Sequence, residues 1–511
     1  MCEPASVPAT PPARHRRVVA LAARLLLAGA LLAACTDDAD GSAPASTTTA
    51  EVTTTTSTTA PPPPVPDVTV TGPVPGTPQT SAADGLDAAG YVEEEFFVRG
   101  SARAFEVDGE LGDDGRWSLA VRDEAPYTTR ILVKRPADPG TASGVVVVEW
   151  NNVSIGSDGT PDWTYTSAEL LRSGHVHVAV SAQASGVDDP DGGSITGGQG
   201  RPLTVADPER YASLVHPGDD HSYDVFAQVG ALVASVPAEG PDPLAGAPRD
   251  HVIAIGESQS AFRLTTFVNG IHPLAPVYDG FFVHSRGGGA APVAAGDEEG
   301  LASSIAGQIR IRDDVDVPVF LFSTETDLTL LGYAGARQPD GATVRSWDVA
   351  GTAHADSFLL GGDAVGAGIG LGCDTPVNDG PQHLALKAAL AHLVDWVVDG
   401  TEPPAGEPIE VGEDGAIVRD EDGNAVGGVR LPAVEVPVAA LSGDAPAGEV
   451  LCRLFGSTTF FPPEDLTARY GDRAGFLARY EDALDRAIAD GLVLEGDRDA
   501  ALAKAEAVDF G

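Results

Sequence analysis

The sequence is poor in basic residues, of which only three are lysines, and it has four cysteines, one methionine and 6% aromatic residues. Lys and Arg together number 31 against 75 Asp and Glu, which gives a formal net charge of −44. A field of that sign repels nucleic acid and anionic lipid head groups, so neither is an expected partner. Apolar residues still make up 43% of the 511 residues, which is enough to build a large core.

The apolar run at residues 25–34 has ten residues and is too short to span a bilayer. Arginines precede it, and it ends in Leu-Ala-Ala-Cys with Cys35 last. This resembles a bacterial lipobox, in which the cysteine is lipidated and becomes the mature N-terminus. Residues 1–35 therefore predict a lipoprotein signal peptide and export, with a lipid anchor on the outer face of the bacterial cell membrane. The alternative is a plain signal peptide with a cysteine at its cleavage site.

The few cysteines favour one disulfide. Cys2 is removed with the signal and Cys35 carries the lipid, which leaves Cys373 and Cys452. In an exported protein, two remaining cysteines most simply pair with each other. Two free buried thiols, or a thiol nucleophile, are the alternatives.

Composition divides the rest of the chain into three parts. Residues 36–82 are rich in Ser, Thr, Pro and Gly and poor in large apolar residues, so they predict a disordered tether. Residues 83–405 alternate apolar strand-like runs with helical patterns, which predicts a mainly parallel sheet covered by helices on both faces. Residues 406–511 read as hairpins and loops followed by helices, an extension expected to pack on the preceding domain.

The stretch "HVIAIGESQSAF" at 251–262 is nearly the G-x-S-x-G turn that mounts a serine nucleophile between a strand and a helix. Its last position holds Ser260 where glycine is expected. A small residue there lets the helix pack against the strand, and serine adds only a hydroxyl that can point to backbone or solvent. The pattern makes Ser258 the candidate nucleophile, although such a turn can also be an ordinary one.

The partners of a serine nucleophile follow in the order that this topology demands, acid before histidine. "VPVFLF" is followed by Glu325 and Asp327, and the next strand by a Gly- and Ala-rich loop with His354. His354 would take the proton of Ser258 while a carboxylate holds its other nitrogen. Asp327 is preferred because the shorter side chain usually fills this role, and Glu325 is the alternative acid.

An oxyanion intermediate needs N–H donors. The backbone N–H of Gln259 is the first expected donor, because this residue follows the nucleophile. The second is expected from "EWNNVS", either from Asn151 or from Asn152.

Six stretches resemble the bacterial "alpha/beta hydrolase domain" group of the α/β-hydrolase superfamily. They cover about residues 90–460 and are VVVVEWNNVS, DPERYASLVHPGDDHSYDVFAQ, IAIGESQSAFRLTTFVNGIHPLAPVYDGFFVHSRGGG, DVPVFLFSTETD, RSWDVAGTAHAD and DGNAVGGVRLPAVEVPVA. The turn of that group resembles G-E-S-Q-S as well, so Ser260 agrees with the pattern of the group. The resemblance implies an α/β-hydrolase fold and a triad of Ser258, an acid within "TETD" and His354. It implies no substrate.

Other residues carry weaker predictions. Glu257 lies beside the nucleophile and would either line the substrate or face solvent. Arg286 follows a strand end and would bind a substrate carboxylate or form a structural ion pair. His175 and His177 share a face of a strand but lack a third ligand, so packing is expected rather than a metal. "RDEDGNAVGG" lacks the glutamate of a calcium loop and predicts a turn.

Together these patterns predict a serine hydrolase that cleaves a carboxylic ester through an acyl-enzyme, without cofactor or metal. The expected partner is a small-molecule ester, and membrane contact is expected only through the anchor. Amide cleavage or acyl transfer by the same triad is an alternative. A non-catalytic surface-binding protein on a hydrolase fold is another.

Overall fold

The computed structural model describes residues 67–80, 82, 85–191, 200–237, 239–294, 307–361, 373–444 and 450–511. The predicted signal peptide with Cys35, and the predicted tether up to residue 66, lie outside these residues. The largest sheet has nine strands in the order β1-β2-β3-β5-β4-β6-β7-β8-β9. Their bounds are β1 Thr69–Thr71, β2 Tyr91–Val107, β3 Leu119–Pro136, β4 Val145–Trp150, β5 Val176–Val180, β6 His251–Glu257, β7 Gly280–His284, β8 Val319–Thr324 and β9 Val344–Val349.

The sheet is parallel from β5 to β9 and antiparallel from β1 to β5 through β2 and β3. The predicted mainly parallel sheet is therefore confirmed. All residues of β4 and β8 are buried, as expected of strands that are covered on both faces. In such a sheet the loops after β6, β8 and β9 all open at the same edge, because these strands run in the same direction.

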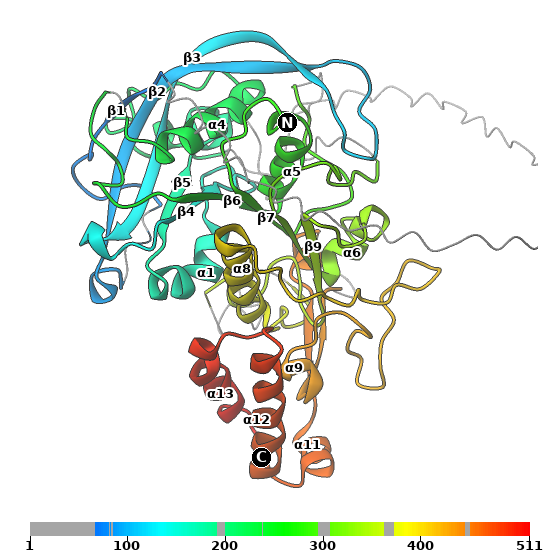
Figure 1. The fold of residues 1–511 in the computed structure, drawn as a ribbon. Helices are drawn as coiled ribbons and strands as arrows, with labels where there is room; N and C mark the ends of the chain where they lie inside the picture. The colour runs from blue at the N-terminus through cyan, green and yellow to red at the C-terminus, as the bar shows by residue number, and fades with distance from the viewer. Residues whose placement is uncertain are drawn as a thin grey trace, which may run out of the picture. The chain divides into compact units, whose positions relative to one another are not determined.

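Helices cover both faces of the sheet (Figure 1). The apolar side chains of β6 alternate between two clusters: Ile253 and Ile255 pack on one side, and Val252 and Ala254 on the other. On the first side lie α1 (Pro161–Arg172) and α8 (Gln382–Asp399), and on the second lie α4 (Ser222–Val233) and α5 (Gln259–Thr266). Each large side chain buried in this way contributes about 1.5–3 kcal/mol.

The predicted end of the tether at residue 82 is wrong. β1 pairs with β2, with Thr69 opposite Arg99 and Thr71 opposite Phe97. Val68 and Val70, in the same segment, are buried. The short alternation "VTVT" is the strand signal, because alternate residues of a strand face the same side. The surrounding Thr- and Pro-rich composition concealed it.

The C-terminal extension consists of short elements that belong to the same compact unit as the sheet. They are α9 Pro432–Glu435, β10 Ala439–Ser442, α10 Val450–Leu454, β11 Ser457–Phe460, α11 Pro463–Tyr470, α12 Arg473–Ala489 and α13 Arg498–Glu506. β10 and β11 form an antiparallel pair, and isolated bridges such as Ile409 with Gly427 form the predicted hairpins. The predicted disulfide between Cys373 and Cys452 is confirmed and joins this extension to the loop before α8.

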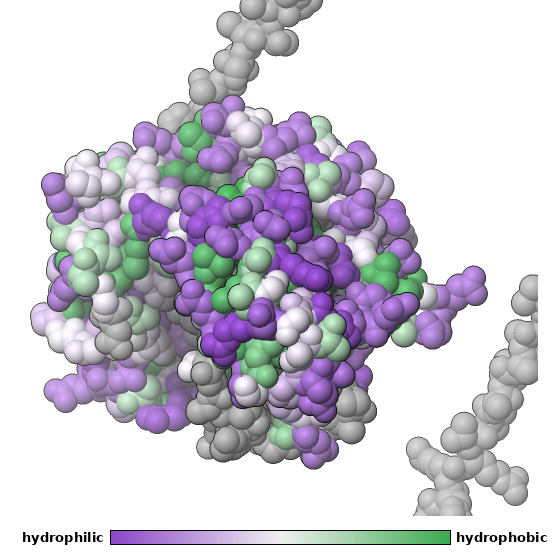
Figure 2. All heavy atoms as spheres, turned by 90° about the horizontal axis from the view of Figure 1, so that it is seen from below, coloured by the Kyte–Doolittle hydropathy of each residue, from purple (hydrophilic) through white to green (hydrophobic). Residues whose placement is uncertain are grey.

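The face seen from below in Figure 2 is mostly hydrophilic, with hydrophobic residues in small groups. Such a surface agrees with the large excess of acidic residues. Among the helices that the structure describes, none has both the length and the apolar character needed to cross a bilayer.

Candidate active site

Ser258 occupies the turn between β6 and α5 and is half-buried. Its backbone has φ 58° and ψ −118°, a conformation that costs a non-glycine residue about 1–3 kcal/mol. Hydrogen bonds hold it there: its N–H donates to the carbonyl of His284 (2.9 Å), and its carbonyl accepts from the N–H of Phe262 (3.1 Å). The predicted turn between a strand and a helix is therefore present, with Ser258 directly after β6.

Small residues allow the start of α5 to pack tightly against the end of β6. A Cβ added to Gly256 would lie 3.0 Å from the Cβ of Ser260 and 3.1 Å from Leu264 Cδ1, so a side chain at position 256 would press on the start of the helix. The Ser260 hydroxyl, expected at backbone or solvent, is instead fully buried and has no hydrogen-bond partner among the described residues. The cause is the packing of the helix start against the sheet.

The three predicted triad residues meet at this edge of the sheet. His354 Nε2 lies 2.7 Å from Ser258 Oγ, and His354 Nδ1 lies 2.7 Å from Asp327 Oδ1. An ionised carboxylate only accepts, so Nδ1 carries the hydrogen and Nε2 is left to accept the hydroxyl proton. The side chain of Asp327 is fixed in this orientation, because its Oδ2 accepts hydrogen bonds from both the N–H (2.7 Å) and the hydroxyl (2.8 Å) of Thr324.

The site favours a charged imidazole. Burial lowers the pKa of His354, but the hydrogen bond and charge of Asp327 and the charge of Glu257 outweigh it and raise the pKa above its usual value. A base of this kind accepts the serine proton more readily than an unassisted imidazole, and the imidazolium that forms is stabilised in place.

Glu325, the alternative acid, is used elsewhere. Its Oε1 accepts from the N–H of Gly351 (2.7 Å), and its Oε2 from the N–H of Gly443 (2.9 Å). Arg419 forms an ion pair with it at 2.7 Å. Glu325 thus links the loop after β9 to the C-terminal extension, and Asp327 is the carboxylate that touches His354.

The C-terminal extension braces both loops that carry the acid and the histidine. Thr326 donates from its hydroxyl to the carbonyl of Gly443 (2.7 Å), and Ala355 donates its N–H to the carbonyl of Leu454 (3.2 Å). The N–H of His354 in turn donates to the hydroxyl of Thr326 (3.1 Å). The two contacts with the extension join residues that are more than 90 positions apart in the chain, so no local sequence pattern predicts them. "SGD" at 442–444 reads as an ordinary turn.

Replacing Gly443 by alanine tests this brace. The added Cβ would lie 2.5 Å from the Cβ of Glu325 and 2.6 Å from the N of Thr326, so the acid loop must move. We expect the free energy of unfolding to fall by about 2 kcal/mol and the rate of Ser258 labelling by a fluorophosphonate to fall by about 10²-fold. Urea unfolding and labelling kinetics measure the two effects.

Gly341→Ala is the matched control, because its Cβ would meet no atom within 4 Å. It should leave both values near those of the wild type. A Gly443→Ala protein that unfolds and reacts like the wild type would show that the extension does not position the triad.

The expected oxyanion donors differ in availability. The N–H of Gln259 is at the first position of α5 and donates to no acceptor among the described residues. Asn152 is not available, because its N–H donates to the carbonyl of Gly159 (2.9 Å) and its Nδ2 to Glu257 (3.0 Å). The N–H of Asn151 donates to the carbonyl of Val180 (3.2 Å), whereas its buried side-chain amide has no partner among the described residues. Asn151 is therefore the better of the two candidates.

Glu257 faces the triad rather than solvent. Its side chain is 6% exposed, and its Oε1 lies 3.6 Å from His354 Nε2. Burial raises the pKa of Glu257 to about 7, with Asp162 and Asp327 adding to the shift and His354 and His284 opposing it. Sequence reasoning marked the residue but did not assign it this neighbour.

Arg286 does not face the site. Its guanidinium is fully buried and donates to the carbonyls of Gly287 (3.1 Å) and Ile309. It also lies over the ring of Tyr333, 5.3 Å from the centroid. Backbone carbonyls thus accept from Nε and Nη2, whereas Nη1 has no hydrogen-bond partner among the described residues. No carboxylate of the described residues pairs with the guanidinium, so the expected ion pair is not formed.

The two strand histidines and the segment 419–428 form structural hydrogen bonds. His177 Nε2 lies 2.7 Å from Glu149 Oε2, and His175 Nδ1 lies 2.7 Å from Ser143 Oγ. In the segment 419–428 the N–H of Asp420 donates to the carbonyl of Asn424 (2.8 Å), which closes a turn. Within the described ranges no three His, Cys, Asp or Glu side chains gather as metal ligands would.

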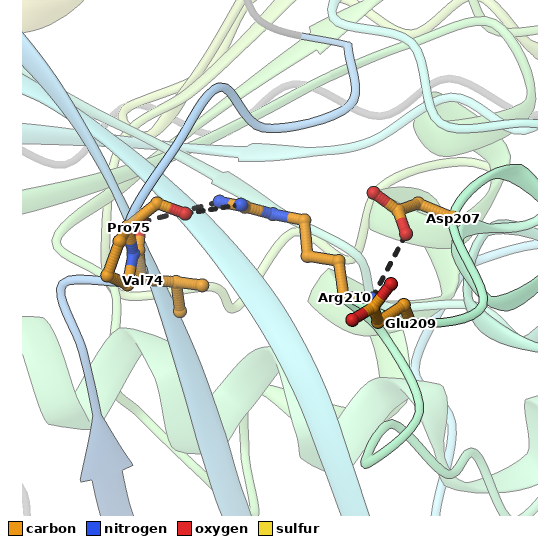
Figure 3. A pocket seen from close by; sticks show the side chains of 5 residues that line it. All are labelled: Val74, Pro75, Asp207, Glu209 and Arg210. Atoms are coloured by element: carbon orange, nitrogen blue, oxygen red, sulfur yellow. Dashed lines mark hydrogen bonds between the residues drawn. The ribbon is translucent and has the colours of Figure 1, made fainter.

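A hollow of about 290 Å³ lies apart from the triad and is lined by Val74, Pro75, Asp207, Glu209 and Arg210 (Figure 3). The Arg210 guanidinium reaches across it and donates to the carbonyl of Pro75 (2.6 Å), and it also pairs with Glu95 (2.5 Å). Its charge is therefore already neutralised, and no nucleophile or base of the triad lines the space. The hollow therefore offers no group of the candidate site.

Comparisons with known proteins agree with this fold. The chain matches the family described as "Alpha/beta hydrolase domain" over residues 59–503. No curated protein was found to match it.

Solved structures resemble it distantly. Acetyl xylan esterase 1 from Thermoanaerobacterium sp. JW/SL YS485 is 16% identical over 35% of this chain and 52% of that one, with a TM-score of 0.19, so the chain spans about half the length of that enzyme. An α/β serine hydrolase from Xanthomonas campestris is 13% identical over 44% and 71%, with a TM-score of 0.22. A glucuronoyl esterase from Solibacter usitatus is 11% identical over 57% and 82%, with a TM-score of 0.28.

The family match covers most of the chain and includes the sheet, the turn at Ser258 and the loops that meet it. The chain therefore belongs to the alpha/beta hydrolase domain family and has the α/β-hydrolase fold.

Proposed function

We propose that the protein is a serine hydrolase that cleaves a carboxylic ester through an acyl-enzyme. The observation that carries the proposal is the continuous relay from Ser258 Oγ through His354 to Asp327, with 2.7 Å at each step. These separations are within the range in which a base can abstract a proton, and Ser258 is half-buried at the turn.

In the acylation step, Ser258 Oγ attacks the ester carbonyl and its proton passes to His354 Nε2. The carbonyl oxygen becomes an oxyanion, for which the N–H of Gln259 and the side-chain amide of Asn151 are the proposed donors. His354 then gives its proton to the leaving alkoxide, so that an alcohol departs and Ser258 carries the acyl group. Asp327 stays ionised throughout and stabilises the imidazolium.

In the deacylation step, water takes the place of the alcohol. His354 Nε2 accepts a proton from the water as its oxygen attacks the acyl carbonyl, and returns the proton to Ser258 Oγ when the acid leaves. The reaction balances as ester and water to acid and alcohol, with the triad restored.

A substrate panel tests this assignment on the full chain. We expect p-nitrophenyl esters to be hydrolysed at a rate well above that of matched anilides, because the alkoxide leaves more easily than an amine. Added alcohols or amines should not divert the acyl group in preference to water. Faster anilide cleavage would favour an amidase, and dominant transfer to the added acceptor would favour an acyltransferase.

The absence of any Ser258-dependent turnover would favour the non-catalytic binding protein instead.

The proposal also includes export and a lipid anchor at Cys35. Only the sequence of residues 1–35 supports that part, together with a disulfide of the kind that oxidising compartments permit.

A further inference from the structure

His354 Nε2 has two oxygen neighbours and not one. Ser258 Oγ lies 2.7 Å from Nε2, and Glu257 Oε1 lies 3.6 Å from the same atom. Adjacent residues of the turn therefore present a hydroxyl and a carboxyl to one nitrogen. The triad as proposed above uses only the hydroxyl.

The Glu257 carboxyl is held in this place. Its Oε2 accepts a hydrogen bond from Asn152 Nδ2 (3.0 Å), which also donates to the Glu257 carbonyl (3.1 Å). Asn152 is itself anchored, since its Oδ1 accepts from the N–H of Ser154 (2.8 Å). In the described part of the chain, Asn152 is the only hydrogen-bond donor to this carboxyl, and it uses Oε2. Oε1 is therefore left to the imidazole.

The other ionisable groups around Glu257 already have partners. From β7, His284 Nδ1 lies 2.8 Å from Asp162 Oδ1 of α1. Also from α1, the Tyr165 hydroxyl donates to Asp356 (3.0 Å). Asp327 from α6 (Glu325–Thr329) bonds the far nitrogen of His354. Among the described residues, His354 is the only basic side chain within ion-pair distance of Glu257, whereas His284 acts on it from farther away.

We propose that Glu257 is a second acidic partner of His354, acting on Nε2 as Asp327 acts on Nδ1. The inference rests on the proposed roles of Ser258 and His354. When the Ser258 proton moves to Nε2, the imidazolium lies between two carboxylates, and both lower the free energy of the charged state. Glu257 forms no covalent bond and gives up no proton in this step. It is a positioning and charge-stabilising residue.

The sign of the effect on pH dependence follows from this arrangement. While Glu257 is ionised, its negative charge beside Nε2 favours the imidazolium and raises the pKa of His354, so the free base forms at higher pH. Glu257→Gln removes the charge and keeps an oxygen for Asn152. The acid limb of the reaction should then move to lower pH, while the plateau rate falls because the imidazolium in the transition state is less stabilised.

The test is the rate of Ser258 labelling by a fluorophosphonate, measured on the full chain between about pH 5 and pH 9, where an imidazole titrates. We expect Glu257→Gln to shift the acid limb down by about one pH unit and to lower the plateau rate by about tenfold. Glu257→Asp keeps the charge but withdraws it from Nε2, so its limb should lie between those of wild type and Glu257→Gln. If Glu257→Gln does not fold, the position of the limb in Glu257→Asp tests the proposal instead.

Asp356→Asn is the matched control. Asp356 is a buried carboxyl two residues from His354, but it accepts from Tyr165 (3.0 Å) and from the N–H of Leu359 (3.0 Å). Its removal should leave the limb in place. An unmoved limb in both Glu257 variants would overturn the proposal, even if their rates fall at every pH, because that result describes a packing role alone.

An equal shift in Asp356→Asn would also overturn it, since any buried charge would then have the effect. Failure of the proposed function gives a different result. In that case the wild type itself would not be labelled at Ser258 at any pH, and the inference about Glu257 would fall with it.

Discussion

Replacing Ser258 by alanine should abolish labelling by a fluorophosphonate and lower kcat for the best ester by about 10⁶-fold. The reason is that the variant has no oxygen at the position where His354 Nε2 now finds a proton donor 2.7 Å away. The fold should persist, because the hydrogen bonds that hold the turn come from the backbone of residue 258 and not from its hydroxyl. Labelling, ester turnover and circular dichroism measure these three points.

Ser260→Ala is the matched control two residues away. Its hydroxyl is fully buried and has no partner among the described residues, so its loss should leave labelling intact and should not lower the melting temperature. A Ser258→Ala protein that is labelled as fast as the wild type would place the nucleophile elsewhere and sink the proposed mechanism.

Replacing Asp327 by asparagine should lower kcat by about 10⁴-fold with little change in the fold. The N–H and hydroxyl of Thr324 both donate to Oδ2, so they select the amide oxygen for that position. The amide NH₂ then faces His354 Nδ1, which must accept. The ring hydrogen moves to Nε2, and the Ser258 hydroxyl loses its acceptor. Pre-steady-state acylation on the purified variant measures the loss directly.

Glu325→Gln separates the two acids. It removes the charge that pairs with Arg419 and disturbs the two glycine N–H groups that Glu325 binds. We expect a fall of about 1–3 kcal/mol in the free energy of unfolding and a far smaller loss of kcat than in Asp327→Asn. The reverse ranking of the two variants in kcat would make Glu325 the acid and contradict the assignment.

Much of the framework was predictable because it depends on local chemistry. Apolar runs such as residues 145–150 can only be stable when covered on both faces, and their alternation with helical patterns predicts a parallel sheet. The strand, turn and helix around Ser258 are local as well. The helix that follows Ser258 changes character along its length, since α5 ends at Thr266 and a π-helical turn continues over Phe267–Ile271.

Other features depended on partners that are distant in the chain. The buried pair Val68 and Val70 was assigned to a tether, because a single short strand carries little signal until its partner β2 is known. For Arg286 a substrate contact and a structural ion pair were the alternatives, since nothing nearby in the sequence shows that the carbonyl of Ile309 accepts from its guanidinium. The neighbour of Glu257 is known only from the tertiary structure, in which the loop after β9 places His354 beside it.

The sequence by itself determined the sheet, the turn at Ser258 and the order in which the acidic residues and His354 follow it, because periodicity and topology restrict where those residues can lie. Only the tertiary structure decided between two neighbouring acids. Asp327 and Glu325 are two residues apart and equally buried, but Thr324 and His354 engage one, while Gly443 and Arg419 engage the other. Thr324 is a local partner of Asp327, but His354, Gly443 and Arg419 come from distant parts of the chain, so the local pattern alone does not encode the choice.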